Sequence, residues 1–356
     1  MTTPLSHVKL GDKLGEDVLT PHGGVLFNKG KIVTPRALEI LQAFLVPSVV
    51  IDSPLNALAR NKGEAAAEPN NTKQTTPPSS LQDEYEKMVA LLKRTFNDYA
   101  PGLSLPVMDL RTQLEKLLQQ AGSYNVLTFS PRTFNEQDYW LHNSVACSIT
   151  SYLMAQWVKL PQKDWMQVAL GGLLHDIGNI RVDRMILMKP TKLTDVEHEE
   201  IKRHPMQGYQ LLKNVAAINE GVKLAALQHH ERVDGSGYPQ GIESSEIHPY
   251  AKIVAIADIF HAMTLNKSYQ KAISPYIVLE QIQSDSFGKL DPGYVRIFIE
   301  KVTQFHNGTV VRLNDDRIGE IVFSDSMHPT RPWVSIDGKI INLTVERQYH
   351  ITEVVR

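Results

Sequence analysis

Residues 250–264, YAKIVAIADIFHAMT, most narrowly limit what this chain can fold into. At a helical period the segment is apolar on nearly every side, so we expect a helix buried inside a helical bundle. It carries one acid, Asp258, and neither Lys nor Arg lies within a helical turn of that acid. A lone buried carboxylate costs several kcal/mol unless a positive group pairs with it. The sequence therefore predicts a buried acid that faces a cation, and a bound metal ion would satisfy it.

Several histidines and one further acid are candidates to share that ion. His175 and Asp176 end the apolar run VALGGLLH, and His229 and His230 end another apolar run before a Gly-rich loop. The complete set of candidate donors is His142, His175, Asp176, His204, His229, His230 and Asp258. Any one of these histidines alone is more often an ordinary core or surface residue. The prediction of a metal site rests on the five histidines taken together with a buried acid that has no Lys or Arg nearby.

The donor types indicate which metals and which chemistry to expect. All are nitrogen or oxygen donors, a set that favours iron or manganese and permits zinc or nickel. Seven ligands exceed the needs of one four-coordinate ion. A carboxylate such as Asp176 can bridge two ions, and paired ions are typical of enzymes that hydrolyse phosphoesters.

The segment that leads to His204, LTDVEHEEIKRHPMQGYQLL, has its own helix signals. Thr194 and Glu197 have the spacing of a capping box, which predicts a helix start. Pro205 disfavours the helical conformation of the residue before it, so we expect this helix to end at His204.

Composition excludes several classes of protein. With 356 residues, 42% hydrophobic and 21% charged, the chain is expected to form two or three globular domains. A net charge of −2 argues against a DNA-binding protein. The single Cys147 forms no intrachain disulfide and fits a reducing compartment. We also find no signal-peptide pattern and no apolar run long enough for membrane insertion, so we expect a cytoplasmic protein.

The first 80 residues divide into a module and a linker. Residues 1–52 have the pattern of a small α+β module, with two short strands around a turn at 22–24. A helix begins after Thr34 at the N-cap, with Pro35 in its first turn. Residues 53–80 lose the large apolar residues and collect Pro, Asn, Thr and Ser, so we expect a flexible linker.

The rest of the chain is mainly helical and ends in short β-type runs. Residues 81–130 carry two apolar helical stripes, more typical of core helices than of a dimerising coiled coil, which remains the alternative. Residues 131–305 are almost wholly helical in pattern. Residues 306–356 hold short β-type runs separated by Asn, Asp and Gly turns. We therefore predict a mainly α protein with a small β-rich C-terminal segment.

Three motifs in these helices, HDIGN, HHERVDGSGYP and ADIFHAMT, resemble those of the HD-GYP domain, a subfamily of the HD phosphohydrolases that hydrolyses cyclic di-GMP. The resemblance covers about residues 130 to 305. It implies an HD-type helical bundle and a metal-dependent phosphodiesterase of bacterial second-messenger signalling. The products it implies are linear pGpG and, after a second cut, GMP. Residues 1–52 resemble more loosely the small module that often precedes such domains.

The resemblance also implies a binuclear metal centre with Asp176 as the bridging ligand. One ion would be held by His142, His175, Asp176 and Asp258. The other would be held by His204, His229 and His230. Some members hold a third ion through a Glu, and the matching position here is the shorter acid Asp138. His175, Asp176 and residue 179 would be the catalytic group.

For the substrate and for partners, the resemblance implies two regions. Gly237, Tyr238 and Pro239 would shape the pocket for cyclic di-GMP and provide a contact for a signalling-protein partner. Lys267 and Lys271 would contact the phosphates. A homodimer through the helices of residues 81–130 is a further expectation.

Four positions depart from the family pattern. Asn179 stands where the family has a Lys close to a phosphate, and an amide offers a hydrogen bond but no charge. Lys267 replaces an Arg that grips phosphate, which removes the bidentate fork, and Gln270 replaces a second basic residue. His261 stands where the family has an Asp, and we assign it no role.

Three functions therefore compete. The first is a metal-dependent cyclic di-GMP phosphodiesterase, which the ligand set favours. The second is a catalytically weak or inactive sensor or scaffold that binds metal and cyclic di-GMP, which Asn179, Lys267 and Gln270 favour. The third is a hydrolase of another cyclic dinucleotide or nucleotide phosphoester.

Overall fold

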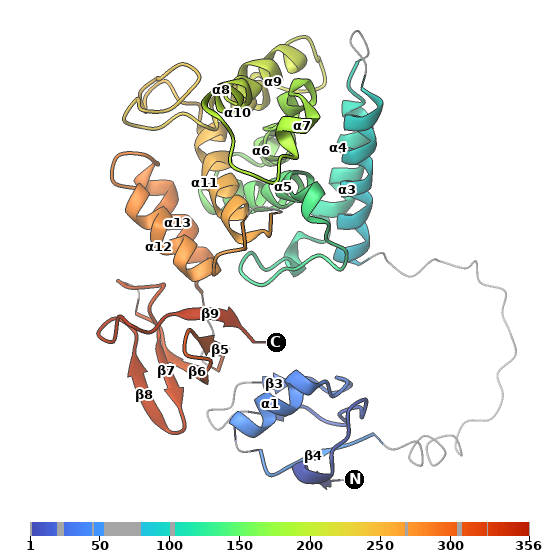
Figure 1. Ribbon diagram of the computed structural model, residues 1–356, viewed down its shortest axis with the longest axis vertical. Coiled ribbons are helices and arrows are strands. Elements are labelled where there is room, and N and C mark those ends of the chain that lie inside the picture. Colours follow the sequence, from blue (N-terminus) through green and yellow to red (C-terminus); the bar gives the residue numbers. More distant parts are fainter. Residues whose placement is uncertain are drawn as a thin grey trace, which may run out of the picture. The chain divides into compact units, whose positions relative to one another are not determined.

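The computed structural model describes residues 2–19, 25–44, 46–52, 80–99, 104–267, 270–304, 308–325 and 327–355. The chain divides into two compact units (Figure 1). One unit comprises residues 79–302, and the other joins residues 1–78 to residues 303–356. The turn expected at 22–24 and nearly all of the linker expected over 53–80 lie outside the described residues.

The unit of residues 79–302 is built from helices, which confirms the mainly α prediction. Its α-helices are α3 (Leu81–Asp98), α4 (Val107–Leu118), α5 (Tyr139–Trp157), α6 (Gln162–Leu174), α7 (Arg184–Leu187), α8 (Asp195–Ile201), α9 (His204–Leu212), α10 (Glu220–Gln228), α11 (Pro249–Thr264), α12 (Pro275–Asp285) and α13 (Pro292–Val302). Three short 3₁₀ helices connect them: η2 (Ala121–Ser123), η3 (Glu136–Asp138) and η4 (Ile177–Arg181). Across all described residues, no helix is both long and apolar enough to cross a membrane.

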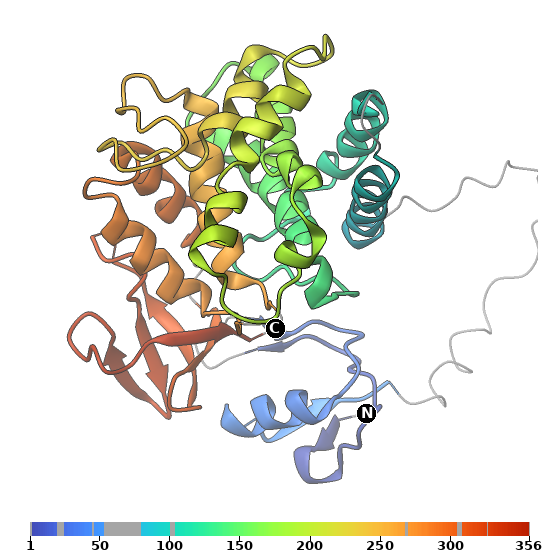
Figure 2. The same ribbon diagram turned by 45° about the horizontal axis from the view of Figure 1, so that its top comes forward.

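Helices α5 and α11 lie in the middle of this unit, between the α3–α4 pair and the α12–α13 pair (Figures 1 and 2). Helix α11 begins with Pro249 in its first turn, and the His248 side chain caps it by accepting from the Tyr250 N–H at 3.2 Å. The apolar faces of α11 pack against α5, α6, α10 and α12, and Asp258 is only 9% exposed. The predicted buried helix with one acid is therefore confirmed.

The apolar stripes of α3 and α4 pack inside this chain. Helix α3 starts with a capping box between Ser80 and Asp83. Its Met88 and the α4 residues Leu110 and Leu114 are fully buried in the same core as residues of α5 and α6. The apolar stripes of α3 and α4 thus face the core of a single chain. This agrees with the first alternative, core helices, and not with a dimerising coiled coil.

Two predictions about α8 have different outcomes. The capping box is confirmed, because the Thr194 side chain accepts from the Glu197 N–H and Glu197 bonds back to the Thr194 N–H. The expected end at His204 is wrong, because α8 already ends at Ile201. Pro205 instead lies in the first turn of α9, where its missing N–H removes no helical hydrogen bond.

The second unit combines both ends of the chain. Its N-terminal elements are β1 (Thr2–Pro4), η1 (Leu5–His7), β2 (Val18–Leu19), β3 (Val25–Phe27), α1 (Pro35–Ala43) and β4 (Ser48–Val50). Its C-terminal strands are β5 (Val310–Leu313), β6 (Ile318–Phe323), β7 (Trp333–Ile336), β8 (Lys339–Asn342) and β9 (Ile351–Val354). These five form an antiparallel sheet in the order β8-β7-β6-β5-β9, while β1 pairs with β4 and β2 with β3.

A shared core joins these two groups of elements. Thr34 caps α1 as predicted, since its hydroxyl accepts from the Ala37 N–H at 3.2 Å. Buried side chains of the N-terminal module, including Leu14 and Ile40, belong to one hydrophobic cluster with Val310 and Ile318 of the sheet. The sequence predicts the N-terminal module and the C-terminal β-rich segment as two separate parts. Periodicity within a segment does not report which distant segment covers its apolar face, so the pattern gives no sign of this shared core.

The core role of α4 leads to a stability prediction. Leu114→Ala removes a side chain with no exposed surface, so we expect the free energy of unfolding of the helical unit to fall by about 2–5 kcal/mol. Met108→Ala on the same helix is the control, because Met108 is 60% exposed and its loss should cost less than about 0.5 kcal/mol. Urea unfolding followed by circular dichroism measures both values. Equal losses in the two variants would contradict the assignment of this stripe to the core.

Candidate metal centre

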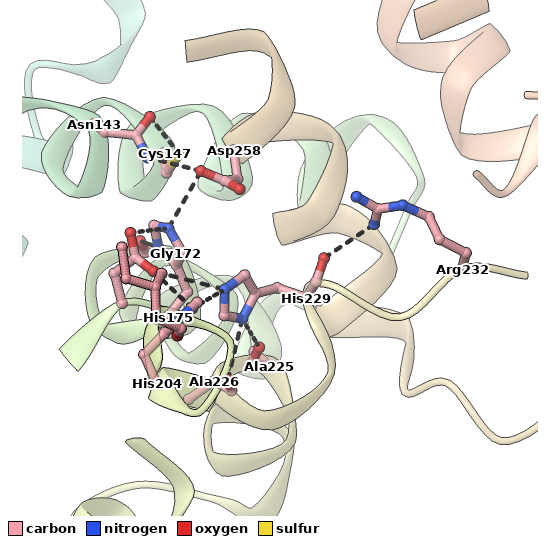
Figure 3. Close-up of polar contacts among 12 residues, drawn as sticks. Asn143, Cys147, Gly172, His175, His204, Ala225, Ala226, His229, Arg232 and Asp258 are labelled. Atoms are coloured by element: carbon pink, nitrogen blue, oxygen red, sulfur yellow. Dashed lines mark hydrogen bonds and ion pairs between the residues drawn. The ribbon is translucent and has the colours of Figure 1, made fainter. Parts of the chain in front are cut away.

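Three buried histidines turn the same ring nitrogen toward the backbone. The Nδ1 atom lies 2.8 Å from a carbonyl oxygen in His175, 2.7 Å in His204 and 3.1 Å in His229, in each case a carbonyl three or four residues earlier (Figure 3). A carbonyl oxygen can only accept, so each Nδ1 carries the proton and donates it. The Nε2 atoms are then the nitrogens available to bind an ion, an arrangement typical of metal-binding histidines.

The Nε2 atoms of two of these histidines converge on Asp176, just after α6. Asp176 Oδ1 is 3.1 Å from His204 Nε2 and 3.7 Å from His229 Nε2, and the two nitrogens are 3.2 Å apart. Two lone pairs at this distance repel unless a proton or a metal ion lies between them. With His230, these residues offer four ligand atoms within 4.8 Å of one another. We call Asp176, His204, His229 and His230 the three-histidine group.

A second group surrounds the remaining nitrogen, His175 Nε2. This atom is 3.3 Å from Asp176 Oδ2 and 3.4 Å from Asp258 Oδ1. It is fully buried, and none of the described residues gives it a hydrogen bond of acceptable geometry. Cys147, His175 and Asp258 offer ligand atoms within 4.8 Å of one another, and we call them the cysteine group. Asn143, one turn before Cys147, donates from Nδ2 to Asp258 Oδ1 at 2.7 Å (Figure 3).

The pKa values of the clustered histidines and carboxylates indicate that the space around His175 Nε2 favours positive charge. Burial alone would lower the pKa of His175, but the carboxylates of Asp176 and Asp258 raise it well above its ordinary value. Burial works against the charge of both carboxylates, yet the neighbouring histidines lower their pKa values below the usual range. Burial lowers the pKa of His229 and of His230, so both rings are neutral near pH 7. Neutral imidazoles beside buried carboxylates are the state in which such residues bind a divalent ion.

The structure does not bring His142 to either group. Its Nδ1 lies 3.4 Å from the Tyr85 hydroxyl, which donates to the His142 carbonyl, and burial lowers its pKa to about 4. The next residue, Asn143, is the one that reaches Asp258. Consecutive residues of a helix point about 100° apart, and here Asn143, not His142, is the one turned toward Asp258. The side chain that α5 directs at the acid is thus an amide, contrary to the expectation for His142.

Two further expected residues have different surroundings. The carboxylate of Asp138 pairs with the Lys93 ammonium at 2.6 Å, which offsets the negative charge that a third ion would use. Asn179 lies in η4 beside the cluster and is only 8% exposed. In the described part of the chain its side-chain oxygen finds no hydrogen-bond partner, although the residue lines the pocket described next. A buried polar atom of this kind needs a partner beyond the described residues.

Both groups open into a pocket of about 1040 Å³. Its wall contains Asp176, His204, His230, Asp258, Asn143 and Asn179, the aromatic residues Tyr139, Trp140 and Tyr238, and the cations Lys189, Lys192 and Lys267. Of the expected substrate residues, Lys267 and Tyr238 line the pocket, whereas Lys271, Gly237 and Pro239 are not part of the lining described. Sequence reasoning missed Lys189 and Lys192, whose only signal was their position just before the Thr194 capping box.

The Gly-Tyr-Pro loop folds back over the histidines. The Tyr238 ring stacks on His230 at 4.6 Å between ring centroids, and the Tyr238 N–H donates to the His230 carbonyl. The buried carboxylate of Glu231 accepts from the backbone N–H groups of residues 240–242. A Cβ at Gly237 would overlap the backbone of Glu231, so only glycine permits this close return. The loop therefore forms one wall of the site.

A second glycine allows the three-histidine group to assemble. Gly178 in η4 packs so closely on α9 that an added Cβ would overlap the carbonyl oxygen of His204. The contact places the first residue of α9 beside Asp176, which precedes Gly178 by two residues.

Residues 130–293 match a family model described as HD domain. The match covers 164 of the 356 residues, so this part of the chain is similar to proteins of the HD domain family. The resemblance inferred from the motifs is thereby confirmed. The family implies divalent metal binding, which agrees with the convergence of bare nitrogens and carboxylates.

Relatives with assigned activities match the same region. A cyclic di-GMP phosphodiesterase of Pseudomonas aeruginosa is 33% identical over 198 residues, which are 56% of this chain and 48% of that protein. The cyclic di-GMP phosphodiesterase response regulator RpfG of Xanthomonas campestris is 37% identical over 39% of this chain and 37% of that protein. The 3'3'-cGAMP-specific phosphodiesterase 1 of Vibrio cholerae is 35% identical over 38% of this chain and 32% of that protein. The chain spans about half or less of the length of these curated relatives.

The close approach of Gly178 predicts the effect of a single methyl group. Gly178→Ala should push α9 away from η4 and separate His204 from Asp176, so metal affinity should fall by about 10- to 100-fold. Metal analysis after equilibrium dialysis measures the change. Gly122→Ala is the control, because its Cβ would meet nothing within 4 Å in the described part of the chain. Unchanged metal affinity in Gly178→Ala would show that the contact does not position His204.

Proposed function

We propose that this chain is a metal-dependent phosphodiesterase that hydrolyses cyclic di-GMP to linear pGpG, with GMP as a further product. The observation that carries the proposal is the set of bare imidazole nitrogens and buried carboxylates at the end of a pocket of about 1040 Å³ with lysines in its wall. A pocket of that size suits a ligand as large as a dinucleotide. Two of the relatives named above carry the name of this activity.

Each part of the site has a task in this proposal. The three-histidine group would hold one divalent ion, and His175 and Asp258 would hold the other, with Asp176 between them. Bound ions would stabilise negative charge on the phosphate and lower the pKa of a water toward ~7. Iron or manganese is the favoured metal, with zinc or nickel as alternatives. Asp138 gives no support to a third ion, because it is paired with Lys93.

The pocket wall would bind and orient the substrate. Lys192 and Lys267 bring positive charge to the dianionic ring, and Lys189 adds to it although it also pairs with Glu197 at 2.6 Å. Tyr139 and Trp140 offer flat surfaces for the bases. The amide of Asn179 would donate to a phosphate oxygen. His229, only 1% exposed, helps to keep bulk water from the far side of the cluster.

Two other functions each have one supporting observation. The uncharged Asn179 in the pocket favours a sensor that binds the dinucleotide and hydrolyses it slowly or not at all. The similarity to a 3'3'-cGAMP-specific phosphodiesterase favours a different cyclic dinucleotide as substrate.

The remaining parts of the chain belong to the same proposal. Residues 1–52 would regulate the helical domain, and the Gly-Tyr-Pro loop would offer a surface to a signalling partner in the cytoplasm. A homodimer through α3 and α4 would have to use their polar faces, because Leu110 and Leu114 are already buried inside the chain.

Product analysis tests the enzyme directly. The protein is reconstituted without oxygen with Fe(II) and separately with Mn(II), and cyclic di-GMP and 3'3'-cGAMP are offered side by side. We expect pGpG or GMP from cyclic di-GMP, and a loss of more than about 100-fold in rate together with one ion per chain in His204→Ala. His7→Ala, which changes an exposed histidine of the other unit, should behave as wild type. Two bound ions with tight binding and no product would favour the sensor, and turnover of 3'3'-cGAMP alone would favour the other substrate.

Restoring a cation at position 179 gives a second test. Asn179→Lys should raise the rate by about 10²–10³-fold, because a positioned charge stabilises the phosphate in the transition state. Asn179→Gln is the matched control, since it lengthens the side chain without adding charge. Steady-state kinetics with cyclic di-GMP separate the two variants. Equal rates in wild type, Asn179→Lys and Asn179→Gln would mean that residue 179 does not contact the reacting phosphate.

A further inference from the structure

The two halves of the metal centre differ in their donors. The three-histidine group has three imidazoles and one carboxylate. Around His175 Nε2, only one imidazole and the carboxylates of Asp176 and Asp258 come together. Helix α5 does not add a histidine, because His142 faces Tyr85. An ion at this second place therefore lacks a strong third donor of its own unless another side chain supplies it.

Helix α5 directs a thiol to this place. Asn143 and Cys147 are one helical turn apart, and the Cys147 Sγ lies 3.7 Å from Asn143 Oδ1, while Asn143 Nδ2 bonds to Asp258 (Figure 3). Cys147 is fully buried, and its Sγ is within 4.8 Å of ligand atoms of both His175 and Asp258. The thiol thus lies on the side of the centre where the donors are fewest.

The same place has a buried nitrogen that points to a ligand. His175 Nδ1 donates to the Gly172 carbonyl, which leaves Nε2 to face the interior of the group. Nε2 is completely buried, and within the described residues it has no hydrogen bond of acceptable geometry. Two carboxylates at 3.3 and 3.4 Å make this position suited to a cation.

We propose that Cys147 is a ligand of the ion held by His175 and Asp258. On binding, the sulfur–metal bond forms and the thiol proton passes to solvent, because a metal ion binds the thiolate. The second site then combines nitrogen, oxygen and sulfur donors, whereas the three-histidine site has only nitrogen and oxygen. Thiolate ligands favour softer ions such as zinc over manganese, so the two sites should differ in metal preference. The inference rests on the metal centre of the proposed function.

Cobalt(II) makes the proposed sulfur bond visible. The full chain is loaded with Co(II) without oxygen, bound cobalt is counted, and absorption is recorded in the near ultraviolet, where thiolate-to-cobalt charge transfer appears. The chain has a single cysteine, so any such band must come from Cys147. We expect two ions per chain with the band. In Cys147→Ser the band should be absent, and the affinity for one of the two ions should fall by about 10- to 100-fold.

Two controls make the result specific. Cys147→Val fills the buried position with an apolar side chain of similar size, so it should fold, lack the band and show the same loss of affinity for one ion. His204→Ala removes a ligand of the other group and should keep the band while it loses the other ion. Circular dichroism confirms that each variant is folded. The wild-type band alone decides whether sulfur binds cobalt if both cysteine variants fail to fold.

The outcomes separate this inference from the proposed function. Cobalt bound without a charge-transfer band, at one or two ions per chain, would overturn the role of Cys147 and leave the metal centre in place. No bound cobalt would overturn both. A band in wild type that disappears in Cys147→Ser and persists in His204→Ala would establish the thiolate ligand.

Discussion

One buried and one largely buried carboxylate that share an imidazole nitrogen are the constraint on which the helical unit depends. Asp176 and Asp258 lie 3.3 and 3.4 Å from His175 Nε2, with the histidine completely buried. Negative charge at this depth is stable only beside positive charge. The need is met by histidines from several helices, because one end each of α6, α9 and α10 lies beside the middle of α11, which carries Asp258. The central packing and the candidate chemistry thus have the same origin.

The backbone prepares the histidines for binding and brings them together. Backbone carbonyl groups accept from the Nδ1–H of His175, His204 and His229. All three rings therefore turn Nε2 toward the centre. Glycine at 178 permits the close contact that holds His204 beside Asp176. The same centre then borders a pocket with lysines in its wall. Bound cations on one side and lysines on the other would complement a phosphodiester, which is the physical basis of the proposed activity.

Three side chains that do not belong to the three-histidine group border this centre. Asn143 bonds to Asp258, Cys147 lies behind it on α5, and Asn179 borders the same pocket. The three-histidine group contains none of these three residues. A protein built in this way would keep one conventional ion site and alter the other, so its metal preference and its rate need not follow those of its relatives.

The sequence by itself determined the helical class, the buried acid at Asp258 and most of the residues that converge around it, because apolar periodicity and unpaired buried charge are local properties of a segment. Only the tertiary structure decided which side chain of α5 enters the centre. That helix is buried on nearly all sides and carries polar residues on several of them, so its pattern does not mark the face that meets Asp258, and a rotation of about 100° exchanges His142 for Asn143. The lysines of the pocket wall and the core shared by the two chain ends also depend on contacts between distant segments. Such contacts leave no periodic signal, and folding alone determines them.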